Sequence, residues 1–250
     1  MALIFQRLAR NFVKNGYYPT DSETMSRIIQ ALSFNGQSCS LIDPCCGEGT
    51  ALAEIKHAIS DDNQVTTYGV EYDKERAWHS KQILDYCIHG DLRDCMISAR
   101  QFGLLFLNPP YGDSVSDKAQ LSASKTGRLR LEKEFYKRAN GLLQFNGVMV
   151  LIIPYYTLDS ELSTWISRHF NRVKAYMAPE KQFQQCVIFG VRHKVTNDWS
   201  TTEEYQTTRQ TLIGVGNGDI KADVLPEHWN EQTFSNHEGD GFYHIPELLD

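Results

Sequence analysis

The chain has 250 residues, of which 41% are hydrophobic and 22% charged, with 25 Lys and Arg against 31 Asp and Glu. These proportions are typical of a globular protein and exclude disordered, collagen-like and coiled-coil chains. The net charge of -6 gives no overall attraction to nucleic acid, although an enzyme that engages nucleic acid briefly needs only a local basic surface.

Residues 1–38 are predicted to form an N-terminal helical segment. A helix is expected over Ser22–Leu32, with Asp21 or Ser22 at its N-terminus. No window of the chain has the ~18–20 uncharged apolar residues of a membrane helix, and basic residues interrupt the apolar start of the chain. We therefore expect a cytoplasmic protein without a membrane segment. A first, amphipathic helix is predicted before Ser22–Leu32, with Leu3, Ile4, Leu8 and Phe12 as its apolar residues.

Residues 39–193 alternate short β-rich runs with stretches of helical spacing. Near-continuous apolar runs such as FGLLFLN and VMVLIIP indicate strands that are buried on both faces. We therefore predict an α/β fold with a doubly wound, mostly parallel, seven-stranded sheet of the Rossmann-like kind. The expected strands are Cys39–Asp43, Val65–Val70, Cys87–His89, Phe102–Asn108, Val148–Pro154, Val173–Met177 and Val187–Arg192. The expected helices are Gly49–Ile59, Tyr72–Leu84, Leu131–Leu143 and Leu158–His169.

Two segments do not follow this alternation. Residues 112–130 form a polar, Ser-rich insertion, and loops of this length are usually functional or mobile. Residues 194–250 are polar and show no pattern, so we interpret them as an appendage of uncertain structure. Between residues 118 and 138 the basic side chains belong either to a loop that contacts a nucleic-acid backbone or to a solvated face. They are Lys118, Lys125, Arg128, Arg130, Lys133, Lys137 and Arg138.

The six cysteines contain no CxxC pair, and several lie in apolar runs. This spacing favours reduced thiols over a disulfide framework or a zinc site, so we expect no metal.

The first predicted strand ends in Asp43 and continues into Pro44-Cys45-Cys46-Gly47-Glu48-Gly49, directly before a helix. Glycines at such a turn allow a ligand to approach the backbone, and the helix N-terminus offers free N–H groups. The loop lacks the Lys-Ser/Thr of a phosphate-binding P-loop. Two further acids follow the next strands, Glu71 and Asp91, and Glu71 lies at the separation from the loop at which an acid reaches ribose hydroxyls.

The strand FGLLFL ends in Asn108-Pro109-Pro110-Tyr111. The prolines stiffen the backbone, so the amide oxygen of Asn108 and the carbonyl oxygen of Pro109 point in fixed directions. These two acceptors suit the two hydrogens of a planar NH₂ group, and Tyr111 offers a flat face for a planar ring.

Together, DPCCGEG, GVEYD, GDL and NPPY resemble the motifs of S-adenosylmethionine-dependent amino methyltransferases, above all N6-adenine DNA methyltransferases. GYYPT at residues 16–20 and FQQCVIFG at residues 183–190 resemble two further segments of this family, so the likeness covers residues 16–193. The stretch is also similar to methyltransferase-like proteins of bacterial mobile elements. The resemblance implies the class I methyltransferase fold, S-adenosylmethionine as the cofactor and no metal.

The resemblance also implies a role for each matching residue. Tyr18, Pro19 and Thr20 would close over the cofactor. Asp43, Gly47 and Gly49 would hold its methionine part, Glu71 its ribose, and Tyr72, Asp91 and Leu92 its adenine. Pro44 and Cys45, in the same loop, would also contact the cofactor. Asn108 would lie beside the cofactor and, with Pro109 and Pro110, form the catalytic segment, and Tyr111 would stack on the target base. Apart from the resemblance, Lys125, Arg128 and Arg130 are expected to bind the substrate, because their basic segment adjoins the proposed pocket.

The substrate that this resemblance favours is N6 of adenine in DNA, with nucleic acid as the partner. The same chemistry on an RNA base or a glutamine amide is an alternative. Only 57 residues follow position 193, which is small for a domain that reads sequence. Either sequence specificity is weak, or a protein partner supplies it, or the substrate is not duplex DNA. A weakly catalytic, cofactor-binding subunit is the remaining alternative.

Overall fold

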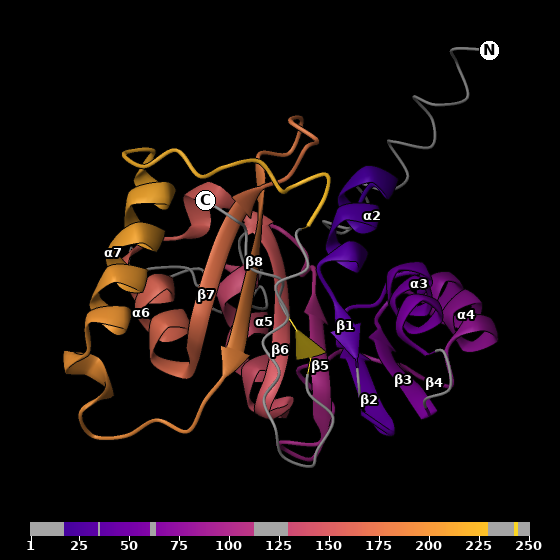
Figure 1. The fold of residues 1–250 in the computed structure, drawn as a ribbon. Coiled ribbons are helices and arrows are strands. Elements are labelled where there is room, and N and C mark those ends of the chain that lie inside the picture. Colours follow the sequence, from indigo (N-terminus) through magenta and orange to yellow (C-terminus); the bar gives the residue numbers. More distant parts are fainter. Residues whose placement is uncertain (1–17, 35, 61–63, 113–129, 230–242, 245–250) are drawn as a thin grey trace, which may run out of the picture.

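The computed structural model describes residues 18–34, 36–60, 64–112 and 130–229, and the backbone of residues 243 and 244. Its centre is a seven-stranded sheet in the order β4-β3-β2-β5-β6-β8-β7 (Figure 1). All neighbouring pairs are parallel except β6 with β8 and β7 with β8. The strands are β2 (Ser38–Asp43), β3 (Gln64–Glu71), β4 (Tyr86–His89), β5 (Phe102–Leu107), β6 (Leu143–Pro154), β7 (Phe170–Met177) and β8 (Gln185–Arg192).

This sheet confirms the predicted fold class. Side chains of β5 alternate between the two faces: Leu104 and Phe106 join one core cluster, and Leu105 and Leu107 join the other. All six residues of β5 are buried, which is why the strand is apolar without interruption instead of alternating with polar residues. The sheet thus separates two hydrophobic layers.

Helices cover both faces of the sheet. The layer on one face contains α2 (Ser22–Gln30) and α3 (Thr50–Ile59), with α4 (Lys74–Ile83) beside β4. The layer on the other face contains α5 (Leu131–Ala139), α6 (Ser160–His169) and α7 (Glu203–Asn217). Figure 1 shows α6 and α7 next to β7, at the opposite end of the sheet from α4.

Most expected elements are present, with differences at their ends. The helix expected over Leu131–Leu143 ends at Ala139, and a 3₁₀ turn over Asn140–Leu142 leads into β6. The strand β6 therefore begins at Leu143, well before the expected start at Val148. Asn and Gly at positions 140 and 141 favour a helix end over helix continuation, and this signal outweighs the apolar periodicity that runs through them.

The region after residue 194 contains a helix that we did not predict. The helix α7 begins after Thr202, whose side chain accepts a hydrogen bond from the Tyr205 amide, and ends at Gly218 in the left-handed conformation. Only a few of its side chains are buried, so its apolar pattern is weak, but Thr202 with two following glutamates and Gly218 are ordinary start and stop signals.

The N-terminal and C-terminal regions meet over the sheet. The side chain of Asp21 caps α2, as expected, by accepting from the Thr24 amide. The Arg27 side chain donates to the Leu225 carbonyl at 2.6 Å, and Trp229 Nε1 donates to the Arg27 carbonyl at 2.9 Å. A short pair of antiparallel strands, β1 (Ser33–Phe34) with β9 (Tyr243–His244), joins the same two regions. The first predicted helix, at Leu3–Phe12, lies outside the described residues.

The contact between α7 and the turn after β6 depends on Gly216. A Cβ atom at this position would lie 2.0 Å from the Leu158 carbonyl oxygen. We expect Gly216→Ala to push α7 away and to lower the free energy of unfolding by about 2–3 kcal/mol, and thus Tm by roughly 5–10 °C. The measurement is thermal unfolding with Gly141→Ala as the control, since no atom lies within 4 Å of a Cβ there. Equal Tm values for the two variants would contradict the prediction.

Within the described residues, no helix is both long enough and apolar enough to cross a membrane.

Candidate active site

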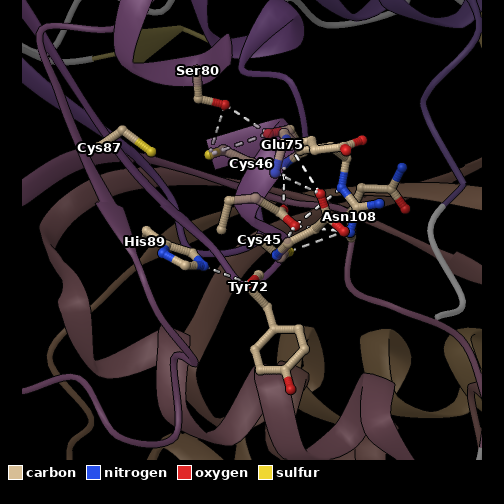
Figure 2. Close-up of polar contacts among 12 residues, drawn as sticks. Cys45, Cys46, Tyr72, Glu75, Ser80, Cys87, His89 and Asn108 are labelled. Atoms are coloured by element: carbon tan, nitrogen blue, oxygen red, sulfur yellow. Dashed lines mark hydrogen bonds and ion pairs between the residues drawn. The ribbon is translucent and has the colours of Figure 1, made fainter. Parts of the chain in front are cut away.

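The candidate site lies at the carboxyl edge of the parallel strands. Asp43 ends β2, Glu71 ends β3, Asp91 follows β4 and Asn108 follows β5. Because these strands are adjacent and parallel, the structure brings the four predicted side chains to one edge of the sheet. Figure 2 shows Asn108 beside Cys45, with Cys46 above them and Tyr72 below.

The loop after β2 is held by its glycines and by β3. Gly47 has a φ of +58° and Gly49 a φ of +82°, which are left-handed values that favour glycine. The Gly47 amide donates to Glu71 Oε2 at 2.9 Å, and the Gly47 carbonyl accepts from Ser80 Oγ at 2.6 Å. The loop is therefore fixed from both the sheet and α4. Sequence analysis did not identify Ser80, whose role depends on the packing of α4.

Asp43 is buried beneath this loop. Its Oδ1 accepts a hydrogen bond from the Cys45 amide at 2.9 Å. Burial nevertheless raises the pKa of Asp43 from 3.8 to about 7, because desolvation outweighs this hydrogen bond. Asp43 is thus poised near neutral pH, where a nearby positive charge would favour its ionised form.

The two cysteines of the loop have structural contacts. Cys45 Sγ donates to the Asn108 carbonyl at 3.3 Å and so joins the loop to the NPPY segment. A Cβ atom at Gly69 would lie 2.6 Å from Cys46 Sγ, so the missing side chain at Gly69 makes room for this thiol. A hydrogen bond with Cys87 raises the pKa of Cys46 and lowers that of Cys87. None of the six cysteines forms a disulfide, and no group of three or more potential metal ligands occurs among the described residues.

Each of the two acids after β3 and β4 is paired with an arginine. Glu71 Oε1 accepts from Arg76 Nε at 3.0 Å and Nη2 at 2.8 Å, while Oε2 accepts from the loop. Arg93 pairs with both carboxylate oxygens of Asp91 and thereby lowers the pKa of Asp91. Sequence analysis missed both arginines. The available signal was their spacing in the sequence: Arg76 follows Glu71 by five residues, and Arg93 follows Asp91 by two.

The remaining residues that were expected to hold adenine differ in exposure. Leu92 is buried, as a pocket wall requires. Tyr72 exposes 65% of its surface, and its carbonyl lies 3.2 Å from His89 Nε2. Its ring is therefore accessible from solvent, and its contact with adenine stays a prediction.

Asn108 connects the N-terminal segment with the NPPY segment. Its Nδ2 donates to the Tyr18 carbonyl at 2.8 Å and to Thr20 Oγ1 at 3.0 Å. Its Oδ1 accepts from Tyr111 Oη at 2.8 Å. Since Asn108 is nearly ninety residues from the N-terminal segment in sequence, these bonds fix the orientation of its carboxamide through the fold, with the oxygen toward Tyr111.

Tyr111 stacks on another tyrosine in this structure. Its ring lies 5.0 Å from that of Tyr18 with an interplanar angle of 16°, and Phe183 contacts the Tyr18 ring at 4.9 Å. The hydroxyl of Tyr111 accepts from Gln185 Nε2 at 2.7 Å, and burial raises its pKa. The proposed stacking of Tyr111 on a target base thus requires Tyr18 to move or the base to enter beside it.

Two hollows flank the loop, and Cys45 and Asn108 line both of them. One, of about 310 Å³, is lined by Tyr18, Pro19, Thr20 and Asp43 among others. The other, of about 380 Å³, is lined by residues of the motifs after β2, β3, β4 and β5, namely Pro44, Glu71, Tyr72, Asp91, Leu92, Pro109 and Pro110. The predicted cofactor residues thus line two adjoining hollows, except Gly47 and Gly49, which line neither.

The basic residues proposed to bind substrate are less accessible than expected. Lys125, Arg128 and Lys118 lie outside the described residues. Arg130 pairs with the buried Glu132 at 3.0 Å and lies over the Tyr156 ring. Lys133 pairs with Asp159 and Glu161. Acidic side chains thus neutralise Arg130 and Lys133, and the role of the basic group toward substrate stays a prediction. Lys137 lies over Trp165, and Arg138 donates to the Arg93 carbonyl.

Three solved structures are similar to this fold. A candidate class I S-adenosylmethionine-dependent methyltransferase from Listeria monocytogenes is 14% identical, with a TM-score of 0.54 over 86% of this chain and 78% of that one. The methyltransferase subunit of a type I restriction-modification system from Streptococcus thermophilus is 16% identical, with a TM-score of 0.54 over 77% of this chain and 49% of that one. The type IIG restriction endonuclease BpuSI is 15% identical, with a TM-score of 0.53 over 89% of this chain and 31% of that one. This chain thus spans about half of the Streptococcus thermophilus protein and about a third of BpuSI.

The site fits S-adenosylmethionine, the cofactor of class I methyltransferases. Acidic side chains lie in both hollows: Asp43 in one, and Glu71 and Asp91 in the other. Such carboxylates suit the cationic methionine part and the hydroxyl and amino donors of the adenosine part. Cys45, in the loop between β2 and α3, lines both hollows, so this loop borders the space for both parts of the cofactor.

A search of curated proteins found no significant match. The sequence does match a protein family, described as an uncharacterised methyltransferase family (DUF6094), over residues 1–212. This match covers most of the chain, including the whole sheet and every described residue of the site. The chain therefore belongs to the methyltransferase family DUF6094.

Proposed function

We propose that this methyltransferase transfers the methyl group of S-adenosylmethionine to an exocyclic amino nitrogen, N6 of adenine in DNA. The observation that carries the proposal is the position of Asn108. Its carboxamide follows a buried strand, lines both hollows and has its oxygen oriented by bonds to the N-terminal segment and to Tyr111. The neighbouring carbonyl of Pro109 supplies a second acceptor, so the segment suits an NH₂ group that carries two hydrogens.

The chemistry of an exocyclic amine explains why two acceptors are needed. Its lone pair is delocalised into the ring, so the nitrogen is a poor nucleophile. Hydrogen bonds from both hydrogens to Asn108 Oδ1 and the Pro109 carbonyl favour a pyramidal nitrogen and stabilise the positive charge that develops on it. The cofactor supplies a methyl group on a cationic sulfur. The protein contributes by holding the acceptors rigidly, and needs neither a metal nor a covalent nucleophile for this reaction.

DNA is favoured as the substrate by the NPPY resemblance. One similar structure is named as a restriction-modification methyltransferase subunit and another as a restriction endonuclease, which is compatible with this substrate. A base in a duplex must be flipped out before it can reach Asn108, at a cost of a few kcal/mol. Tyr111, Tyr18 and Phe183 place aromatic rings next to Asn108, where such a base would have planar partners.

A protein partner that reads the DNA sequence is part of the proposal. Between residues 199 and 229, the described chain packs on the domain itself: α7 lies against α6, and Leu225 and Trp229 join the core. These residues therefore do not form a separate reading unit. A stable partner in pull-down experiments that raises the methylation rate would support this part.

The decisive experiment is transfer of labelled methyl from S-adenosylmethionine to unmethylated genomic DNA, total RNA and lysate protein. Mass spectrometry of the digested products identifies the methylated atom. We expect N6-methyladenine in the DNA. Label only in RNA bases or in glutamine would overturn the DNA assignment and keep the amino chemistry. Saturable cofactor binding without transfer to any of the three would favour a cofactor-binding subunit.

The raised pKa of Asp43 makes cofactor binding depend on pH. A cationic methionine part favours ionised Asp43, so binding releases a proton when the pH lies below about 7. We expect affinity to rise between pH 5 and 7 and to decline above about pH 8, where a free α-amino group loses its charge. Calorimetric Kd measurements across this range test the prediction, with Asp43→Asn expected to flatten the rise. If affinity rises between pH 5 and 7 as steeply in Asp43→Asn as in wild type, the prediction is wrong.

Asp43 also affects the folding stability of the cofactor-free protein, and its raised pKa determines the direction of the effect. The pKa of Asp43 is higher in the folded than in the unfolded chain, so the folded state binds more protons. The stability that neutral Asp43 provides is complete below about pH 4 and is lost as the pH rises through about 7. Asp43→Asn should therefore raise Tm relative to wild type more at pH 8 than at pH 5.

A further inference from the structure

Gln185, a buried glutamine at the start of β8, contacts the NPPY segment. Gln185 is 2% exposed, and its Nε2 donates to Tyr111 Oη at 2.7 Å. Tyr111 Oη in turn donates to Asn108 Oδ1 at 2.8 Å. These three side chains come from two strand ends and a loop, so they form one continuous chain of hydrogen bonds that ends at the proposed acceptor oxygen.

The direction of these bonds follows from the groups themselves. The Tyr18 carbonyl can only accept, so the neighbouring atom of Asn108 must be Nδ2, and Oδ1 must face Tyr111. Oδ1 can only accept, so the single proton of Tyr111 points toward it. Tyr111 Oη then has lone pairs left, and Gln185 must present its NH₂ group to them. Burial, which raises the pKa of Tyr111, keeps the phenol protonated.

The backbone around Gln185 holds this donor in place. Gln185 pairs with Pro154 at the end of β6, and its carbonyl accepts from the Ala178 amide at 2.9 Å. A buried carboxamide is costly unless it is hydrogen-bonded, so an apolar residue would be the ordinary choice at a position that only packs. The polar side chain is explained by its bond to Tyr111.

We propose that Gln185 is a positioning residue that acts through Tyr111 on Asn108. By donating to Tyr111, it directs the phenolic proton to one lone pair of Asn108 Oδ1 and leaves the other lone pair for the target amine. It also keeps the Tyr111 ring from rotating away. This role rests on the proposed function, because it concerns the acceptor that the amine would use.

The test reverses the direction of the bond. A carboxylate can only accept, so in Gln185→Glu the phenolic proton turns to the new side chain and leaves Asn108. The protonated form of the introduced carboxyl can donate as the glutamine amide does, so the variant should lose activity as the pH rises through the pKa of that buried carboxyl. At pH 8 we expect kcat to be at least tenfold below wild type, with KM and cofactor Kd within about twofold. Gln184→Glu, at the exposed neighbouring position, should behave as wild type.

A double-mutant cycle separates this role from general damage. If Gln185 acts through the Tyr111 hydroxyl, Gln185→Glu should cause no further loss of kcat in a Tyr111→Phe background. The fall in activity with rising pH should also be absent there. An equal loss in both backgrounds, or unchanged kcat in the single variant, would overturn the proposal.

The chain of hydrogen bonds from Gln185 through Tyr111 to Asn108, here called the relay, can also be tested without a substrate. The side-chain amide NMR signals of Asn108, assigned by comparison with Asn108→Asp, should shift in cofactor-free Gln185→Glu and stay in place in Gln184→Glu. If wild-type protein methylates no nucleic acid but these signals shift, the proposed function fails and the relay stands. If methylation occurs and the signals do not shift, the relay fails and the function stands.

Discussion

Replacing Asn108 with alanine is expected to lower the rate of methyl transfer by about 10³-fold. Alanine removes the oxygen that would accept from the target amine, and with it the main electrostatic support for the charge that develops on the nitrogen. It leaves the Pro109 carbonyl in place, so the loss should fall on kcat. The measurement is single-turnover transfer of labelled methyl to DNA with saturating cofactor, which separates chemistry from product release.

The structure also predicts an effect of this variant on cofactor binding. Asn108 Nδ2 also holds the Tyr18 carbonyl and Thr20 Oγ1, and these residues line the hollow that contains Asp43. We therefore expect a severalfold weaker cofactor Kd in addition to the loss of rate. Thr20→Val is the matched control, because it removes one of these bonds and keeps the acceptor oxygen: it should share the change in Kd and keep a kcat close to wild type. Transfer by Asn108→Ala at the wild-type rate would exclude Asn108 from catalysis.

The core of the fold was predictable because its signals are local. Apolar runs such as that of β5 are buried on both faces, so their composition alone indicates a parallel sheet with helices on both sides. The weak pattern of α7 has the opposite cause. Its burial depends on its packing against α6 and on Gly216, which a periodicity argument cannot detect. The capping signals at Thr202 and Gly218 were the better guide there.

The site was predictable to the level of which residues meet, but not of how they bond. Parallel strands bring Asp43, Glu71, Asp91 and Asn108 to one edge whatever their partners are. The partners come from other segments: Gln185 reaches Tyr111 across 74 positions of sequence, and Tyr18 reaches Asn108 across 90. No spacing rule links such pairs. The stacking of Tyr111 on Tyr18 also depends on this tertiary arrangement, which is why the sequence suggested a free aromatic face.

Glu71 is the residue whose loss should weaken cofactor binding most. It joins three parts of the site, since it accepts from the Gly47 amide, the Asp73 amide and Arg76. Arg76 and Asp73 occupy Oε1, and Gly47 takes one position on Oε2, so Oε2 retains a lone pair for a ribose hydroxyl. A hydrogen bond to a charged group contributes about 1.5–3 kcal/mol. Losing the ribose contact and the anchor of the loop together should thus raise the Kd for S-adenosylmethionine by about 10²–10³-fold.

Glu71→Gln and Glu71→Ala test this expectation by isothermal titration. Glutamine keeps the size of the side chain and one acceptor oxygen, so its loss of affinity should be smaller than that of alanine and should occur without a large fall in Tm. Glu75→Ala is the control, because Glu75 is an exposed acid in the first turn of α4. If charge near the site were all that mattered, Glu75→Ala and Glu71→Gln would weaken binding alike. Because Glu71 is buried and bonded to the loop, only its variants should do so, and equal Kd values would remove the ribose role from Glu71.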